Sequence, residues 1–155
     1  LRVVGQKVIA LEHIGSTAVP GLGAKPIIDM MAGVTQSKDA DECLPPLDRI
    51  GYTDVTPQLG NPDWYYCLAK HYHNVGYHLH LVRYMSDHWK KHLVFRDYLR
   101  KHSDVAEQYH KLKKELSSKY GSDRVRYTEA KTSFIESVIL LAQKQNDSEQ
   151  VMSRS

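Results

Sequence analysis

The prevailing spacing of the apolar residues in this 155-residue chain changes close to residue 86. Before that point they form short runs or alternate with polar residues, which is typical of strands. These runs are residues 8–14, 27–34, 51–56, 64–70 and 77–83. After that point they recur every three or four residues, which predicts helices beginning near Asp87, Asp104 and Thr128. Strands followed by helices indicate an α+β fold: a mixed, mostly antiparallel sheet with C-terminal helices packed against it.

One further helix and the chain end complete the predicted organisation. Residues 38–50 have helical spacing, and Pro45 and Pro46 predict that this helix is short or kinked. From Asn146 the apolar periodicity is lost, which predicts a flexible tail over residues 146–155. We therefore expect one globular domain over residues 1–145, followed by that tail.

Composition narrows the class of protein. Hydrophobic residues make up 41% of the chain and charged residues 25%, which is ordinary for a globular domain and argues against extensive disorder. No apolar run approaches the ~18 residues of a membrane span, and no signal peptide is visible, so we expect a cytoplasmic protein without a membrane partner. Cys43 and Cys67 form no closely spaced pair and are expected to be reduced and buried.

The segment HIGSTAVPGLGAKPIIDMM, residues 13–31, carries the most specific chemistry. Gly15 lets the backbone approach an anion, and the Ser16 hydroxyl with neighbouring N–H groups can donate to phosphate oxygens. Asp29, in the next predicted strand, supplies a hard oxygen ligand for a divalent ion that neutralises the phosphates. Lys25 could reach the same phosphate, and an ordinary surface position is the alternative.

This segment resembles the nucleotidyltransferase signature, in which Gly and Ser precede an acidic pair, and its longer string is similar to GrpB proteins. Two further features resemble that family: FRDYLR at residues 95–100, and the pairs Tyr109/Lys113 and Tyr127/Lys131. The resemblance extends over residues 8–143. It implies a nucleotidyltransferase-like fold that binds a nucleotide or another phosphorylated small molecule with a divalent metal ion (Mg²⁺, Mn²⁺ or Zn²⁺).

One position departs from the nucleotidyltransferase pattern. The residue two after Asp29 is Met31, where active members of that superfamily carry a second acid. A thioether does not replace a carboxylate as a ligand of Mg²⁺. The sequence therefore leaves open whether the chain is an enzyme. The alternative is an inactive accessory module that binds a nucleotide or a coenzyme A precursor, since GrpB-like domains also occur fused to dephospho-coenzyme A kinase.

His78 and His80 lie two residues apart on a predicted strand, so their imidazoles share a face. In nucleotidyltransferases a later strand supplies a third acid, and this strand is its expected equivalent. With Asp29 the two histidines would form a site of two imidazoles and one carboxylate, which suits Mn²⁺, Zn²⁺ or Fe²⁺ better than Mg²⁺. The alternative is that both histidines form hydrogen bonds in a polar cleft.

The helical half is rich in Lys and Arg, several of them one helical turn from a partner. Such cations could clamp phosphates while tyrosines stack on a base or sugar. The residues expected to bind the nucleotide in this way are Arg96, Arg100, Lys113, Tyr127 and Lys131. The alternatives are that Asp97 pairs with its neighbouring cations and the tyrosines pack at the core edge, or that the basic helices bind RNA.

Overall fold

The structure is a computed structural model that describes residues 2–56 and 66–153. Its contacts divide the chain into two compact units. The sheet unit holds the chain up to Ala18 and from Ala24 to His92, and the helical unit holds Val19–Gly23 and the chain from Leu93 onward. The predicted α+β class is confirmed by the order of the elements, in which strands precede three long helices of the described chain.

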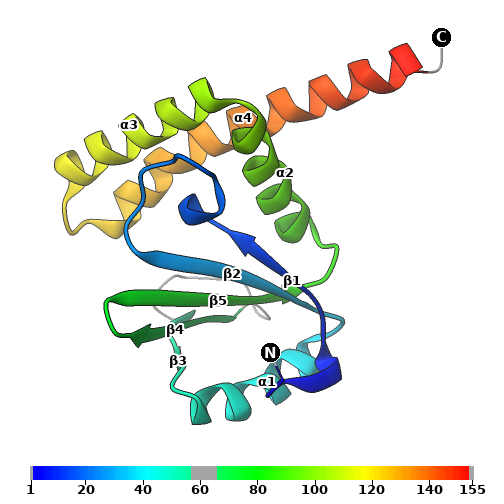
Figure 1. Cartoon of the computed structure of the whole chain (residues 1–155), viewed down its shortest axis with the longest axis vertical. Coiled ribbons are helices and arrows are strands. Elements are labelled where there is room, and N and C mark those ends of the chain that lie inside the picture. Colours follow the sequence, from blue (N-terminus) through cyan, green and yellow to red (C-terminus); the bar gives the residue numbers. More distant parts are fainter. Residues whose placement is uncertain (1, 57–65, 154–155) are drawn as a thin grey trace. The chain divides into compact units, whose positions relative to one another are not determined.

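Within the described residues, five strands form one mixed sheet in the order β1-β2-β5-β4-β3 (Figure 1). They are β1 (Val8–Ile14), β2 (Ile27–Val34), β3 (Thr53–Asp54), β4 (Tyr66–Tyr72) and β5 (Val75–Arg83). The neighbours β2 and β5 are parallel and the other three pairs are antiparallel, which confirms the expected mostly antiparallel sheet.

Two predicted strands differ from the observed ones. The segment predicted at residues 51–56 forms only the two-residue β3. The N–H groups of Gly51 and Tyr52 donate instead to the carbonyls of Asp48 and Leu47 at the end of the preceding helix, so the strand begins only at Thr53. Of the strand predicted at residues 64–70, the first two residues lie outside the described residues, and β4 continues to Tyr72.

One face of the sheet packs against α1 (Ser37–Arg49). The core cluster between them consists of Val4, Ala32, Val34, Ala40, Cys43, Leu47, Leu68, Leu79 and Leu81. The helix continues through Pro45 and Pro46, where the sequence predicted a short or kinked helix. Cys43 before the prolines and Leu47 after them are both buried in this cluster, so packing on both sides stabilises the helix across them.

Alternation along the strands places a different set of side chains on the opposite face. In β2, Ala32 belongs to the core beside α1, so Asp29 and Met31 point to the other side. In β5, Leu79 and Leu81 are buried in the same core, so His78 and His80, which alternate with them, share the face of Asp29. Cys67 of β4 and Cys43 of α1 are buried and free, as predicted.

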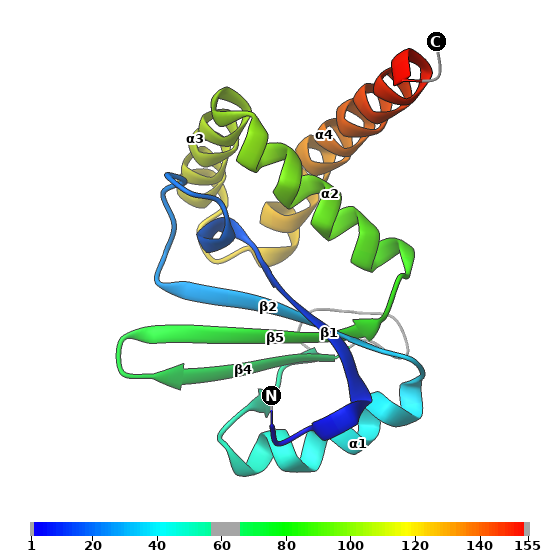
Figure 2. The same cartoon turned by 45° about the vertical axis from the view of Figure 1, so that its right-hand side comes forward.

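The helical unit consists mainly of α3 (Ser103–Tyr120) and α4 (Arg124–Ser153), preceded by the C-terminal part of α2 (Asp87–Lys101). Figure 2 shows α3 and α4 side by side, and the two helices contact each other. The Tyr109 ring of α3 stacks on Phe134 of α4 with 5.5 Å between ring centroids. No helix in the described part of the chain is both long and apolar enough to cross a membrane.

The C-terminal end differs from the prediction. The sequence predicted a flexible tail from Asn146 and gave no sign of a helix there, but α4 continues to Ser153. Residues 146–153 contain no Gly or Pro, so nothing in the run breaks the helix. The loss of apolar periodicity marks the end of burial, since residues 146–148 are exposed, and not the end of the helix. The flexibility of residues 146–155 and the domain limit at residue 145 stay predictions.

Candidate functional site

Asp29 lies where the backbone pairing of β1 with β2 ends. Ile14, the last residue of β1, is opposite Asp29 in the antiparallel register, and Gly15 follows with a φ of +72°. A Cβ atom at position 15 would lie 2.5 Å from Asp29 Oδ2, far inside van der Waals contact. Glycine is therefore required both for the backbone conformation and because the carboxylate packs directly against the turn.

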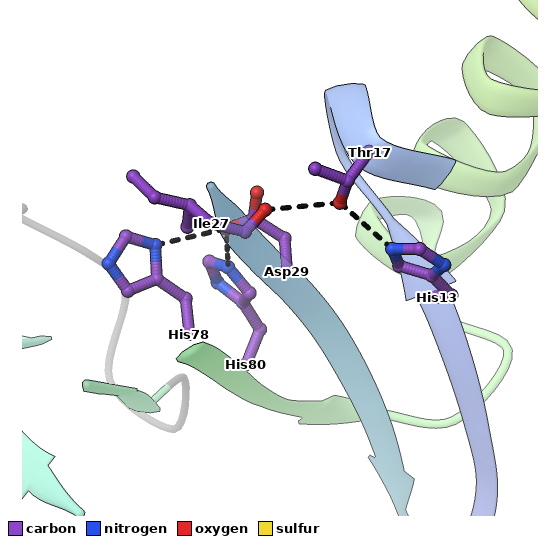
Figure 3. A network of polar contacts seen from close by, with 6 residues as sticks. All are labelled: His13, Thr17, Ile27, Asp29, His78 and His80. Atoms are coloured by element: carbon purple, nitrogen blue, oxygen red, sulfur yellow. Dashed lines mark hydrogen bonds and ion pairs between the residues drawn. The ribbon is translucent and has the colours of Figure 1, made fainter. Parts of the chain in front are cut away.

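Two histidines of β5 face the other oxygen of this carboxylate (Figure 3). The parallel register places His78 beside Asp29. His78 Nδ1 lies 3.0 Å from Asp29 Oδ1, a hydrogen-bond distance, and His80 Nε2 lies 3.9 Å from the same oxygen. The carboxylate thus presents Oδ1 to the histidines and Oδ2 to the Gly15 turn.

These surroundings hold Asp29 in its ionised form. Burial by itself would raise the pKa of Asp29, because it removes the charged carboxylate from water. The hydrogen bond from His78, the approach of His80 and the positive charge of both rings when protonated outweigh burial and lower the pKa of Asp29 to about 2. The site therefore contains a carboxylate anion at neutral pH.

A second set of polar contacts holds the turn itself (Figure 3). Thr17 lies in η2 (Ser16–Ala18), a single 3-10 turn that follows Gly15. Thr17 Oγ1 donates to the carbonyl oxygen of Ile27 at 3.0 Å and lies 2.9 Å from His13 Nε2. Thr17 and His13 were not among the predicted site residues, and the signal that could have identified them is their place on either side of Gly15–Ser16.

Known proteins are similar to this sequence over most of its length. The family model described as GrpB protein matches residues 1–140. The chain belongs to the GrpB family. It is 34% identical over 140 residues to the glutamate-rich protein GrpB of Alkalihalophilus pseudofirmus, and the match covers 88% of this chain and 80% of that protein.

The structure of a GrpB protein has also been solved. The crystal structure of conserved protein GrpB from Enterococcus faecalis is 31% identical, with a TM-score of 0.77, and the match covers 94% of this chain and 86% of that one. A shorter match, 35% identical over 65 residues, links 38% of this chain to 16% of a dephospho-CoA kinase of Mycolicibacterium paratuberculosis. The resemblance to GrpB proteins is thereby confirmed, and the likeness to the nucleotidyltransferase superfamily stays a prediction.

The metal site predicted for this GrpB-family chain consists of Asp29, His78 and His80. The structure brings the three residues together, but no group of three His, Cys, Asp or Glu side chains in the described chain has an arrangement that could hold a metal ion. His78 Nδ1 and Asp29 Oδ1 face each other in a hydrogen bond, whereas metal ligands face a common point. Oδ2 is the oxygen of Asp29 that lies against the Gly15 turn. Metal binding stays a prediction.

Met31 occupies the position at which the superfamily pattern has a second acid. Its side chain is fully buried, with 0% of its surface exposed. In the register of the sheet it is opposite Glu12 of β1 and beside His80 of β5. This GrpB-family chain therefore has an apolar, water-free position where a second metal ligand would be needed.

The other predicted phosphate ligands of the sheet unit lie near the turn in sequence. Ser16 is half-buried at the start of η2, and Lys25 is exposed two residues before β2 begins. The exposure of Lys25 is compatible with both interpretations left open by the sequence. Phosphate binding by Gly15, Ser16 and Lys25 stays a prediction.

Asp97 pairs with the two arginines of α2 that were expected to bind phosphate. Arg96 Nε donates to Asp97 Oδ1 at 2.8 Å, and Arg100 Nη1 lies 3.5 Å from the same oxygen. The Arg96 side chain is only 10% exposed. Pairing with Asp97, which the sequence left open as an alternative, is therefore present.

The two Tyr–Lys pairs of the helical unit form cation–π contacts. Lys113 Nζ lies 4.9 Å from the centroid of the Tyr109 ring, and Lys131 Nζ lies 5.0 Å from that of Tyr127. These side chains and the two arginines belong to the helical unit, whereas Asp29 belongs to the sheet unit. Nucleotide binding by the helical residues of this GrpB-family chain stays a prediction.

Asp29→Asn should change the dependence of stability on pH. Because folding lowers the pKa of Asp29 from 3.8 to about 2, its ionised form stabilises the fold fully above about pH 4, and this contribution is lost as the pH falls toward 2. The shift corresponds to roughly 2 kcal/mol. In urea unfolding between about pH 6 and pH 2.5, the free energy of unfolding should fall more steeply for the wild type than for Asp29→Asn.

The exposed Asp48 of α1 offers a matched control for that experiment. Asp48→Asn removes the same charge from the same unit without touching the histidines. Parallel stability curves for the wild type and Asp29→Asn would contradict the lowered pKa of Asp29.

Proposed function

We propose that the chain binds a nucleotide or another phosphorylated small molecule at the Gly15–Ser16 turn, together with a divalent cation at Asp29. The observation that carries this proposal is the position of Asp29 Oδ2 against the Gly15 turn. An ionised carboxylate at that point repels a bare phosphate, and a cation between them removes the repulsion. Mg²⁺ is commonly bound in this way, by one or two carboxylates and the phosphate oxygens of a substrate.

The residues around the turn supply the remaining chemistry in this proposal. The absence of a side chain at Gly15 leaves room for the carboxylate, the Ser16 hydroxyl and N–H donate to phosphate, and Lys25 adds a positive charge. His78 and His80 fix the orientation of Asp29 through Oδ1 and leave Oδ2 for the cation.

The partial match to a protein named dephospho-CoA kinase supports the choice of ligand class. The molecule in that name is a phosphorylated nucleotide derivative. Coenzyme A precursors therefore stand beside ordinary nucleotides as candidate ligands.

Binding without turnover is the second candidate function, and Met31 favours it. Nucleotidyl transfer by the two-metal route needs a pair of acids to hold both ions. Position 31 is fully buried and carries a thioether, so one ligand of that pair is missing. Once binding is shown, an activity assay would test whether the chain also transfers the nucleotide.

A thermal-shift screen tests the proposal. The purified chain is heated with ATP, CTP or dephospho-CoA, each alone and with Mg²⁺, Mn²⁺ or Zn²⁺. A ligand at about a hundred times its Kd adds roughly 2.7 kcal/mol of stability, which raises the Tm by several degrees in a domain of this size. We expect at least one ligand to give such a shift that depends on the metal.

Two controls identify the site and the type of ligand. Asp29→Asn should lose the metal-dependent part of the shift, whereas Asp48→Asn should keep it. A steep fall in affinity with salt would instead indicate contact with many phosphates, as in RNA. The absence of a shift with every ligand and metal would refute the proposed function.

A further inference from the structure

The hydroxyl of Thr17 determines the direction of the hydrogen bonds around it. A hydroxyl has one proton, and Thr17 Oγ1 donates it to the carbonyl oxygen of Ile27 at 3.0 Å. At its other contact, 2.9 Å from His13 Nε2, the oxygen of Thr17 must therefore accept. His13 carries a proton on Nε2, and the order of donation is His13 to Thr17 to Ile27. We call this chain of hydrogen bonds the Thr17 link (Figure 3).

The Thr17 link joins three segments at the end of the β1–β2 ladder, where backbone pairing between the two strands stops. His13 is in β1, Thr17 is in η2 and Ile27 is the first residue of β2. The register of β1 with β2 ends at the pair Ile14 and Asp29, so the residues beyond it have no partner in that ladder. The link replaces ladder hydrogen bonds with side-chain hydrogen bonds, and it encloses Gly15 and Ser16.

We propose that Thr17 and His13 are positioning residues of the phosphate site: the Thr17 link fixes the Gly15–Ser16 turn against β2. This inference rests on the proposed function, because it concerns the same turn. Neither residue needs to touch the ligand. They hold the Ser16 hydroxyl and N–H in place before a phosphate arrives, so that binding does not have to order the turn.

The link explains why position 17 carries a hydroxyl on a β-branched side chain. The β-branch restricts χ1, and the hydroxyl is the only atom of the side chain that can both accept from His13 and donate to Ile27. Valine has the same shape but makes neither hydrogen bond. Thr17→Val would leave the two partners of the hydroxyl without it, while the backbone would keep its preferred conformations.

Four variants test the proposal in matched pairs. Thr17→Val removes the hydroxyl, and Thr17→Ser keeps it. His13→Gln places an amide nitrogen the same number of bonds from Cα as Nε2, whereas the amide nitrogen of His13→Asn is one bond closer and falls short of Thr17. The ligand is pyrophosphate with Mg²⁺, and its affinity is measured by calorimetric titration. A second readout is hydrogen exchange of the backbone amides of residues 15–18.

We expect affinity and exchange to depend on whether the variant side chain keeps its hydrogen bonds in the Thr17 link, and not on its size. Thr17→Val and His13→Asn should bind pyrophosphate roughly five- to tenfold more weakly and exchange the turn amides faster, while Thr17→Ser and His13→Gln should resemble the wild type. Unchanged exchange and affinity in Thr17→Val, or equal behaviour of His13→Gln and His13→Asn, would overturn the proposal.

Exchange does not depend on a ligand, so the two proposals can fail separately. If the amides follow the expected order but the wild type binds no phosphate compound, the turn is positioned by the link and the proposed function is wrong. If the wild type binds pyrophosphate with Mg²⁺ but all four variants bind it equally, the proposed function stands and the positioning role is wrong.

Discussion

Replacing Met31 with Asp is expected to lower the free energy of unfolding by about 3–5 kcal/mol at neutral pH. The Met31 side chain is fully buried and lies on the same face of β2 as Asp29, which is ionised. In the sheet register the new carboxylate would stand between Glu12 and His80. It would lose its water and face two acids, and one imidazole does not compensate for both effects.

Urea unfolding of matched variants would measure this effect. Met31→Leu keeps the apolar volume and should cost less than about 1.5 kcal/mol. The proposed cation site adds a second expectation: Met31→Asp restores an acidic pair, so Mn²⁺ should raise its unfolding midpoint more than that of the wild type. An Asp variant as stable as the Leu variant without metal would contradict the burial of position 31.

Gly15→Ala is expected to be the next most damaging substitution, with a loss of at least about 2 kcal/mol. Two causes act together. The φ of +72° is unfavourable for alanine, and the new Cβ would lie 2.5 Å from Oδ2 and 3.0 Å from Cβ of Asp29. The carboxylate cannot rotate away from the turn without losing its hydrogen bond to His78. Gly15→Ala should also abolish binding of a metal–nucleotide complex, because it changes the turn at which the complex is proposed to bind.

Gly21 provides the control that separates the two causes. Its φ of +76° is close to that of Gly15, but a Cβ there would meet nothing within 4 Å. Gly21→Ala therefore measures the backbone strain alone, by chemical denaturation under the same conditions. In the double variant of Gly15→Ala with Asp29→Ala, the contact with the carboxylate is removed and only the 3.0 Å approach to Cβ of residue 29 remains, so part of the lost stability should return. Equal losses for Gly15→Ala and Gly21→Ala would rule out the clash.

Much of the sheet could be predicted because alternation along a strand states which side chains share a face. Alternation placed His78 and His80 together, and the string around Gly15 and Asp29 indicated the turn. It could not state which strand lies next to β2. That depends on the order of the sheet, in which β5 is inserted beside β2 although β3 and β4 come earlier in the chain. The grouping of Asp29 with the two histidines therefore rested on the resemblance to nucleotidyltransferases, and the hydrogen bond of Asp29 to His78 came from the structure.

Other features depend on contacts that periodicity does not report. The sequence showed that Met31 replaces an acid, but not that the position is closed to water. Spacing placed Arg96 and Arg100 one turn apart and left open whether Asp97 pairs with them, because the rotamers of all three decide between the possibilities. The helix beyond Asn146 was missed because apolar spacing detects burial, and an exposed helix needs none.

Asp29 and His78 are 49 positions apart, and the parallel pairing that joins them requires α1, β3 and β4 to lie between. Contacts across such a span form slowly, because a long loop must close before they stabilise anything. During translation, Gly15 and Asp29 are synthesised well before His78 and His80. We therefore expect the carboxylate to gain its partners late in folding. A ligand that needs the complete group should therefore slow unfolding far more than it speeds folding.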